Sequence, residues 1–128
     1  MEPLARPPAS ADGVQVVRRF NDALNAHDAE AMLRLMTPDC VFENTDPAPE
    51  GARYEGQAAV RAFWESFFQA STHAAIEIEE IFACEARCVM RWKYRWLDLA
   101  GKPGYIRGVD IYRLAGGLIA EKLSYVKG

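Results

Sequence analysis

The sequence predicts an α+β domain: three N-terminal helices packed on a strongly curved antiparallel sheet, which forms a cone-shaped half-barrel with an apolar pocket. Two observations support this fold class. Apolar residues recur at helical spacing in three segments before residue 72, whereas apolar and polar residues alternate as in strands over most of residues 75–126. Several of these strands are about ten residues long, or roughly 33 Å when extended. A domain of 128 residues has a radius of gyration near ~14 Å, so such strands must bend around a pocket.

Three segments have the amphipathic pattern of helices. Residues 12–26 carry apolar side chains every three or four positions, and Asp12 is placed to cap them. Asp28 is placed to cap a second helix over residues 28–36, which ends before a Pro-Asp pair. The third helix, at residues 57–71, follows a glycine and has a broad apolar face.

The strands are predicted from alternation and from the turn residues between them. They are expected at residues 40–45, 76–82, 88–97, 105–114 and 118–126. In the second of these, Ile76, Ile78 and Phe82 are the apolar members. The pair Gly116 and Gly117 predicts a hairpin turn before the last strand.

The strand at residues 88–97 gives the clearest signal. Large apolar side chains occupy one face and basic side chains the other; the two sets are Met90, Trp92, Tyr94 and Trp96, and Arg91, Lys93 and Arg95. Such a stripe is usually core, but in a bent sheet the core and the pocket wall can share one face. The apolar set is therefore expected to reach the pocket.

Composition and charge exclude several classes of partner. A net charge of -3 argues against a nucleic-acid partner, and no run of residues approaches the ~20 apolar residues of a membrane span. Cys40, Cys84 and Cys88 lack metal-ligand spacing, and without a secretion signal they predict reduced thiols in the cytoplasm. Residues 1–11 are rich in Pro and Ala and are expected to form a flexible arm, which leaves residues 12–128 as a single domain.

The order of these elements and five short motifs resemble a known family. The motifs are residues 16–28, 38–44, 54–64, 107–114 and 117–121. In this order they resemble bacterial ketosteroid isomerases and SnoaL-like polyketide cyclases, which belong to the nuclear transport factor 2-like superfamily. The resemblance covers about residues 12–126 and implies the cone-shaped fold. That superfamily includes enzymes, binding proteins and oligomerising modules, so the fold alone does not define the function.

The resemblance also indicates candidate catalytic residues. The isomerase base falls on Asn44, which cannot accept a proton, and Asp46 matches the family's Asp-Pro pair if two extra residues are allowed. The oxyanion-hole tyrosine falls on Phe20, which has no hydroxyl group. The aspartic acid of that hole falls on Asp110, which is retained. The catalytic candidates are therefore Asp110, Asp46 and Asn44.

Asp110 lies in an otherwise apolar strand, and the resemblance turns its face toward the cavity. Gly108 is expected to leave room for a ligand beside the carboxyl group. Two roles are open for Asp110: a neutral acid that donates a hydrogen bond to a ligand carbonyl, or an ion-pair partner if Lys122 points inward. The side chains expected to line the pocket are Phe20, Phe42, Trp64, Met90, Trp92, Tyr94, Tyr112 and Lys122.

Two functional hypotheses follow. In the first, the pocket binds a small apolar molecule with a carbonyl group and catalyses a proton-shifting isomerisation, cyclisation or dehydration. In the second, the domain is a non-catalytic ligand-binding or dimerisation module. No phosphate loop, nucleophile elbow or metal-ligand cluster occurs in the sequence, so neither a cofactor nor a metal is expected. A homodimer is expected through the outer face of the sheet, where Val109 and Ile111 point away from the Asp110 side.

Overall fold

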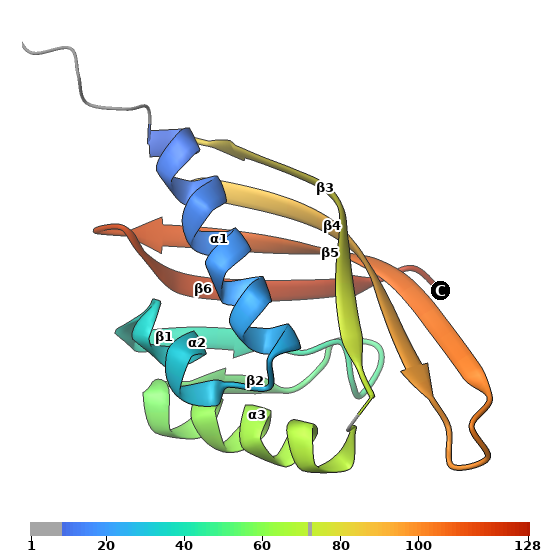
Figure 1. The fold of residues 1–128 in the computed structure, drawn as a ribbon. Helices are drawn as coiled ribbons and strands as arrows, with labels where there is room; N and C mark the ends of the chain where they lie inside the picture. Colours follow the sequence, from blue (N-terminus) through green and yellow to red (C-terminus); the bar gives the residue numbers. More distant parts are fainter. Residues whose placement is uncertain (1–8, 72) are drawn as a thin grey trace, which may run out of the picture.

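The computed structural model describes residues 9–71 and 73–128 (Figure 1). Its helices and strands are α1 (Ala9–Asn25), α2 (Ala29–Arg34), β1 (Met36–Glu43), β2 (Arg53–Glu55), α3 (Gln57–Ala70), β3 (Ala75–Cys84), β4 (Arg87–Leu97), β5 (Pro103–Ala115) and β6 (Leu118–Val126). The three helices lie across one face of a single bent sheet, which confirms the α+β class. Strand β2 is an addition that the sequence pattern did not predict.

The sheet is mixed, which corrects the expectation of a wholly antiparallel one. Its strand order is β2-β1-β6-β5-β4-β3. All neighbours pair antiparallel except β1 and β6, which pair in parallel, with Phe42 opposite Lys122. The chain leaves β1, passes through α3 and the β3-β4-β5 meander, and returns in β6 beside β1. This long return satisfies the crossover that parallel strands require.

The first two helices, α1 and α2, have different boundaries from those that the sequence predicts. Helix α1 begins at Ala9, so the predicted start at Asp12 lies inside the helix. Residues 1–8 of the expected arm lie outside the described residues. The predicted cap at Asp28 is confirmed, since its Oδ1 accepts a hydrogen bond from the Ala31 amide at 3.0 Å. Helix α2 ends at Arg34, before residue 36, because the chain then enters β1.

Strand β3 contains a bulge that changes which side chains face inward. The register with β4 runs from Ile78 opposite Trp92 to Glu80 opposite Arg91, and Glu79 has no opposite residue. Beyond this extra residue the alternation shifts by one position. Phe82 therefore points outward and is 51% exposed, although unbroken alternation from Ile76 and Ile78 predicts an inward side chain at this position.

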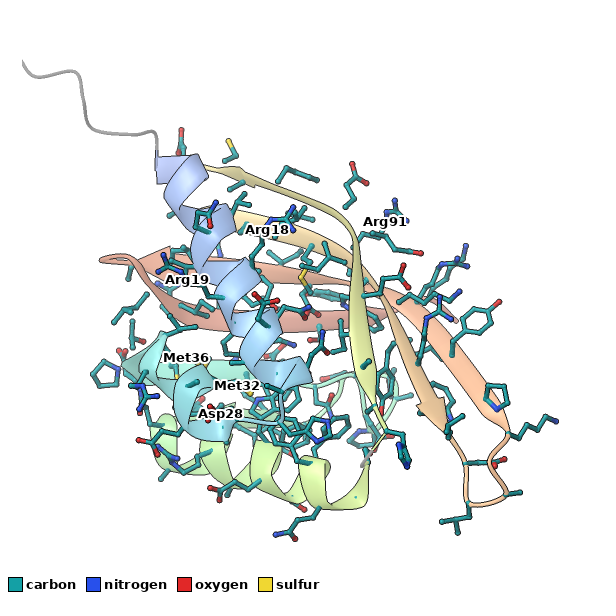
Figure 2. The ribbon with its side chains drawn as sticks, in the orientation of Figure 1. Arg18, Arg19, Asp28, Met32, Met36 and Arg91 are labelled. Atoms are coloured by element: carbon teal, nitrogen blue, oxygen red, sulfur yellow. The ribbon has the colours of Figure 1, made fainter. Side chains whose placement is uncertain are left out.

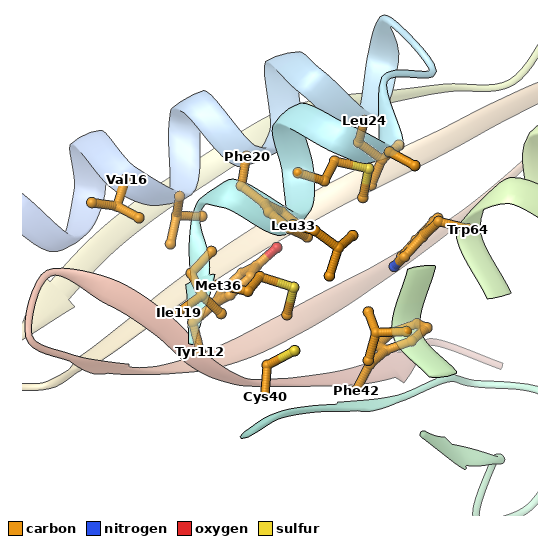
Figure 3. Packing of buried hydrophobic residues seen from close by; sticks show 14 of the residues in the cluster. Val16, Phe20, Leu24, Leu33, Met36, Cys40, Phe42, Trp64, Tyr112 and Ile119 are labelled. Carbon is orange, nitrogen blue, oxygen red and sulfur yellow. The ribbon is translucent and has the colours of Figure 1, made fainter. Parts of the chain in front are cut away.

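The hydrophobic core fills the space between the helices and the concave face of the sheet. In α1, Val17 and Phe20 are fully buried, while Arg18 and Arg19 point to solvent (Figure 2). Met32 belongs to the same core cluster. Figure 3 shows further members: Leu33, Met36, Cys40, Phe42, Trp64, Tyr112 and Ile119. The core side chains fill one part of the cone, and a cavity remains beside α3.

In the described part of the chain, no helix has the length and apolarity needed to cross a membrane.

Candidate functional site

A cavity of about 350 Å³ lies between α3 and the inner face of the sheet. Its lining comes from every strand except β2, together with α3 and the loop after β1. The lining residues are Phe42, Asn44, Thr45, Asp46, Phe63, Trp64, Phe67, Ile76, Trp92, Tyr94, Ile106, Asp110, Lys122 and Ser124. The volume is at the small end of the range for ligand pockets, about 300–1,000 Å³, and the mainly apolar wall with few polar groups is typical of such pockets.

A buried ion pair forms the polar part of this cavity. Lys122 Nζ lies 3.1 Å from Asp110 Oδ2, and the two side chains are only 4% and 2% exposed. Lys122 Nζ also donates to Ser124 Oγ at 2.9 Å. Asp110 accepts two further hydrogen bonds, from Trp92 Nε1 to Oδ1 at 2.9 Å and from the Tyr112 hydroxyl to Oδ2 at 3.2 Å. The three polar groups that contact the carboxylate, from Trp92, Tyr112 and Lys122, are thus all donors.

Strand register explains why these side chains meet. In the β5–β6 ladder, Asp110 lies opposite Ser124, and Tyr112 lies opposite Lys122. Residues two apart on a strand point to the same face, so all four side chains project inward. Since Lys122 points inward, Asp110 takes the second of the two roles that the sequence left open, the ion-pair partner.

Gly108 has a different role from the one predicted. It lies opposite Trp92 in the β4–β5 ladder, and the indole ring of Trp92 lies across it. A side chain at this position would overlap the ring and the carbonyl oxygen of Tyr125. The absence of a Cβ at Gly108 therefore makes room for Trp92 and not for a ligand, and it lets the indole reach Asp110.

Burial and charge keep the nearby phenols protonated. Burial raises the pKa of Tyr112 well above its usual value, and the negative charge of Asp110 raises it further. The Tyr112 hydroxyl therefore remains a hydrogen-bond donor to Asp110 at all ordinary pH values. Burial also raises the pKa of Tyr94, although a hydrogen bond with Ser71 partly offsets this effect.

The apolar wall is mostly aromatic. Phe42 stacks on Trp64 with 5.1 Å between ring centroids and contacts Phe63 at the same distance. Phe67 reaches across from α3 to Tyr94 at 6.0 Å. Lys122 Nζ lies 4.7 Å from the centroid of the Phe42 ring, close enough for a cation–π interaction. The lysine nitrogen thus lies near both aromatic rings and oxygen acceptors.

The structure brings most of the predicted site residues together. The cavity is lined by eight of them: Asn44, Asp46, Asp110, Phe42, Trp64, Trp92, Tyr94 and Lys122. Phe20, Met90 and Tyr112 do not line it, which corrects the prediction; they are buried in the core, where Phe20 packs edge-on against Tyr112 with centroids 6.1 Å apart. Helix α1 contacts β3, β4 and β6 directly, so these side chains fill the space beneath it.

Sequence reasoning missed Thr45, Phe63, Phe67, Ile76, Ile106 and Ser124 as lining residues. Phe63 and Phe67 were visible as part of the apolar stripe of α3, but nothing in that stripe distinguishes core from pocket wall.

Asp46 is exposed at the rim of the cavity. A larger, open hollow of about 780 Å³ shares Tyr94 and Ile106 with the cavity and lies at its side. No group of three or more metal-ligating side chains occurs within residues 9–71 and 73–128.

Comparisons with known proteins agree with this architecture. The sequence model of the SnoaL-like domain matches residues 17–122. An NTF2-like protein of unknown function from Mesorhizobium loti is 35% identical, with a TM-score of 0.80 over 96% of this chain and 97% of that one. A candidate SnoaL-like polyketide cyclase from Jannaschia sp. CCS1 is 17% identical, with a TM-score of 0.80 over 98% and 92% of the two chains. A candidate ketosteroid isomerase from Kribbella flavida is 16% identical, with a TM-score of 0.77 over 94% and 82%. No curated protein is significantly similar in sequence to this chain.

Proposed function

The chain belongs to the SnoaL-like domain family, and from this premise we propose that its cavity binds a small apolar molecule with a carbonyl group. The observation that supports this most directly is the buried Lys122–Asp110 pair in an otherwise apolar cavity. An ammonium group has three N–H donors. Among the described residues, the oxygens of Asp110 and Ser124 accept two of them, which leaves one donor for a ligand oxygen.

The proposed activity is a proton shift without a cofactor. A base removes a proton next to the ligand carbonyl, and the electron pair moves onto the carbonyl oxygen, where the Lys122 ammonium stabilises the enolate. Return of the proton to another carbon completes an isomerisation. Asp46 is our candidate for the base, because its carboxylate lies at the cavity rim, whereas Asn44 beside it can only hydrogen-bond. Cyclisation or dehydration would pass through the same enolate.

Ligand pairs that differ only in the carbonyl group test the binding step. We expect acetophenone to raise the melting temperature and to quench tryptophan fluorescence saturably, because Trp64 and Trp92 line the cavity. Ethylbenzene lacks the oxygen and should bind about tenfold or more weakly, since a hydrogen bond to a charged group contributes roughly 1.5–3 kcal/mol. Equal binding of the two compounds, or binding of neither, would contradict the proposal.

Hydrogen–deuterium exchange tests the chemical step. In D₂O, the protein should accelerate exchange of the methyl protons of acetophenone, followed by NMR. Asp46→Asn should reduce this rate about 10²–10⁴-fold, as expected for the loss of a general base, and leave binding unchanged. Glu50→Gln is the matched control: it removes an exposed carboxylate from the same loop, outside the cavity, and should retain most of the exchange rate.

The second candidate function is non-catalytic ligand binding. It is favoured by Phe20, which is buried and offers no hydroxyl where the resemblance places a tyrosine. Saturable acetophenone binding without any accelerated exchange would select this function.

We also propose that the protein forms a homodimer through the outer face of the sheet. That face carries Val89, Arg91, Lys93, Val109 and Ile111, and Tyr105 and Tyr125 on it are 56% and 51% exposed. Burying such apolar groups contributes roughly 1.5–3 kcal/mol each. Sedimentation at tens of micromolar should give a dimer, and a monomer would contradict the proposal.

A cytoplasmic location is proposed from the free thiols of its three cysteines.

A further inference from the structure

Lys122 has the surroundings of a nucleophilic amine. Its side chain lines the cavity, and its nitrogen lies 3.1 Å from a carboxylate oxygen of Asp110 that can accept its proton. The other three lysines of the chain, Lys93, Lys102 and Lys127, lie outside this cavity. Buried lysines are the ones that act as bases and as Schiff-base nucleophiles in proteins.

We propose that Lys122 forms a covalent imine with an aldehyde or an unhindered ketone bound in the cavity. This inference rests on the proposed function for the binding step and adds a bond that reversible binding does not need. The ligand class is a small carbonyl compound with an apolar, preferably aromatic, body, because the cavity is small and its wall is largely aromatic.

Imine formation needs only Lys122, Asp110 and the carbonyl group of the ligand to carry its protons. Lys122 passes a proton to Asp110 Oδ2, and the freed lone pair attacks the carbonyl carbon. The amine proton moves to the former carbonyl oxygen and gives a carbinolamine. Asp110 then returns its proton to that hydroxyl group, which leaves as water, and the nitrogen lone pair forms the C=N bond. The product is an iminium ion beside an Asp110 carboxylate.

The charge of the cavity is the same before and after this step. It begins with one cation and one carboxylate, and it ends with one cation and one carboxylate. No net charge is therefore created or removed in the low-dielectric interior, where such a change would be costly. Trp92 and Tyr112 hold the carboxylate in place throughout, because both donate to it.

Reductive trapping of the full chain tests the imine. The protein is incubated with benzaldehyde and sodium cyanoborohydride, and the benzylated lysine is located by peptide mapping. Because the bound carbonyl is held next to the amine, we expect Lys122 to be modified about tenfold or more faster than each of the other lysines. This comparison is made within one wild-type molecule, so it does not depend on a variant that fails to fold. Modification of Lys122 at or below the rate of the exposed lysines would overturn the proposal.

Variants and a binding measurement separate this inference from the function on which it rests. Lys122→Met should abolish the fast modification, whereas Lys127→Met, which removes an exposed lysine just beyond β6, should leave it unchanged. Asp110→Asn keeps the amine and removes the proton acceptor, so it should slow the modification. Saturable fluorescence quenching by benzaldehyde with no adduct at Lys122 would overturn the imine and leave carbonyl binding intact. The absence of any saturable quenching would overturn both.

Discussion

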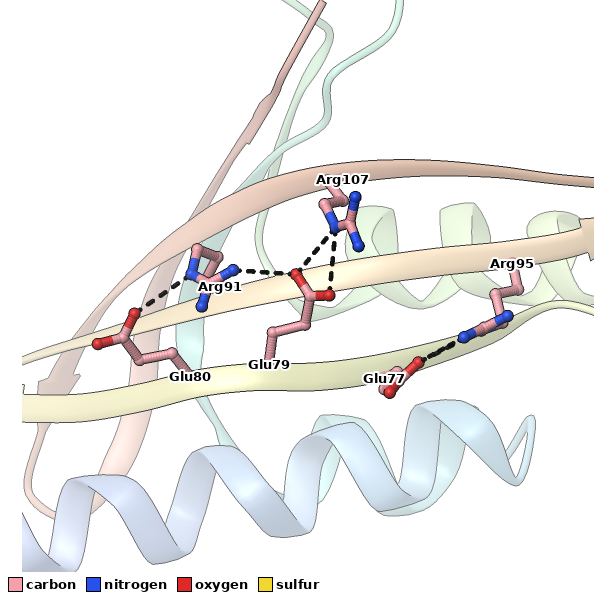
Figure 4. A network of polar contacts seen from close by, with 6 residues as sticks. All are labelled: Glu77, Glu79, Glu80, Arg91, Arg95 and Arg107. Carbon is pink, nitrogen blue, oxygen red and sulfur yellow. Dashed lines mark hydrogen bonds and ion pairs between the residues drawn. The ribbon is translucent and has the colours of Figure 1, made fainter.

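The two faces of the sheet hold the same kinds of charged groups in opposite environments. On the inner face, Lys122 and Asp110 form one buried pair. On the outer face, Glu79 binds both Arg91 and Arg107, and neighbouring glutamates pair with Arg91 and Arg95 (Figure 4). The outer arginines are 45–57% exposed. Water already solvates the outer arginines, although Glu79 between them is only 18% exposed. The two inner charges are shielded from water and depend on each other and on their hydrogen-bond partners.

This difference predicts opposite consequences of breaking a pair. Exposed ion pairs contribute about 0–1 kcal/mol, because solvent screens them and replaces the lost partner. Removal of one member of a buried pair leaves an uncompensated charge in an apolar site. Removal of one member of the inner pair is therefore expected to destabilise the protein, whereas removal of both members is expected to cost little. Substitutions in the outer network are expected to change stability little at any position.

The largest expected effect is that of Lys122→Met. Leaving Asp110 buried without its cation should lower the free energy of unfolding by about 3–5 kcal/mol, measured by urea denaturation. The double variant Lys122→Met/Asp110→Leu removes both charges and should recover most of that loss. If the double variant is as unstable as the single one, the inner pair contributes through packing and not through charge.

Gly108→Ala should have the next largest effect. The added methyl group would overlap the Trp92 ring and the carbonyl oxygen of Tyr125, which should cost about 1–3 kcal/mol and displace the indole from Asp110. A shift of the indole N–H resonance in NMR spectra reports the displacement. Gly104→Ala is the control: it meets the Trp96 ring at 2.7 Å, but Trp96 is partly exposed and can move aside. An equal loss in both variants would contradict this explanation.

Alkaline pH should weaken the inner face before it affects the outer one. Burial raises the pKa of the Cys88 thiol to about 11 from 9.0, so between these values the folded state binds more protons than the unfolded state. Stability is then lost as the pH rises above 9, by about 1 kcal/mol at pH 10. Urea denaturation of the wild type and of Cys88→Ala over pH 7–10 measures this loss. An identical pH dependence in the two proteins would rule out Cys88 as its origin.

The smallest expected effect is on the outer face. Arg91→Ala removes the pairs with the partly buried Glu79 and the exposed Glu80. Because Arg91 itself is half exposed, this change should alter the free energy of unfolding by less than about 1 kcal/mol. What remains of the effect should shrink further at high salt, because salt screens exposed charges. A loss comparable to that of Lys122→Met would mean that the outer network is shielded from solvent, as it would be in the proposed dimer.

Most of the fold was accessible from the sequence because it follows from local periodicity. The alternation in β4 and the Gly116–Gly117 turn both depend on neighbouring residues, and both are confirmed. The parallel pairing of β1 with β6 and the bulge at Glu79 were not predicted. Each depends on contacts between segments far apart in the chain, which a local pattern does not encode.

The candidate site shows the same limit. Eight of the residues that line the cavity could be identified from strand parity and the family resemblance, and six could not. The direction of Lys122 and the position of Trp92 over Gly108 were not predicted either, since they depend on how side chains from two strands share a limited space. Periodicity assigns a side chain to one face of the sheet, but packing decides whether that side chain belongs to the core or lines the cavity.

The bulge at Glu79 has a consequence for how this strand tolerates changes in length. Ile78 faces inward before it and Ile81 faces inward after it, although three positions separate them. If Glu79 were deleted, the two isoleucines would lie two positions apart and would still share the inner face. The strand can therefore lose or regain one residue here without reversing which side of the cone each side chain occupies. A deletion elsewhere in the same strand would reverse the facing of every residue between the deletion and the bulge. Side chains that face the interior there would then face the solvent, and those that face the solvent would face the interior.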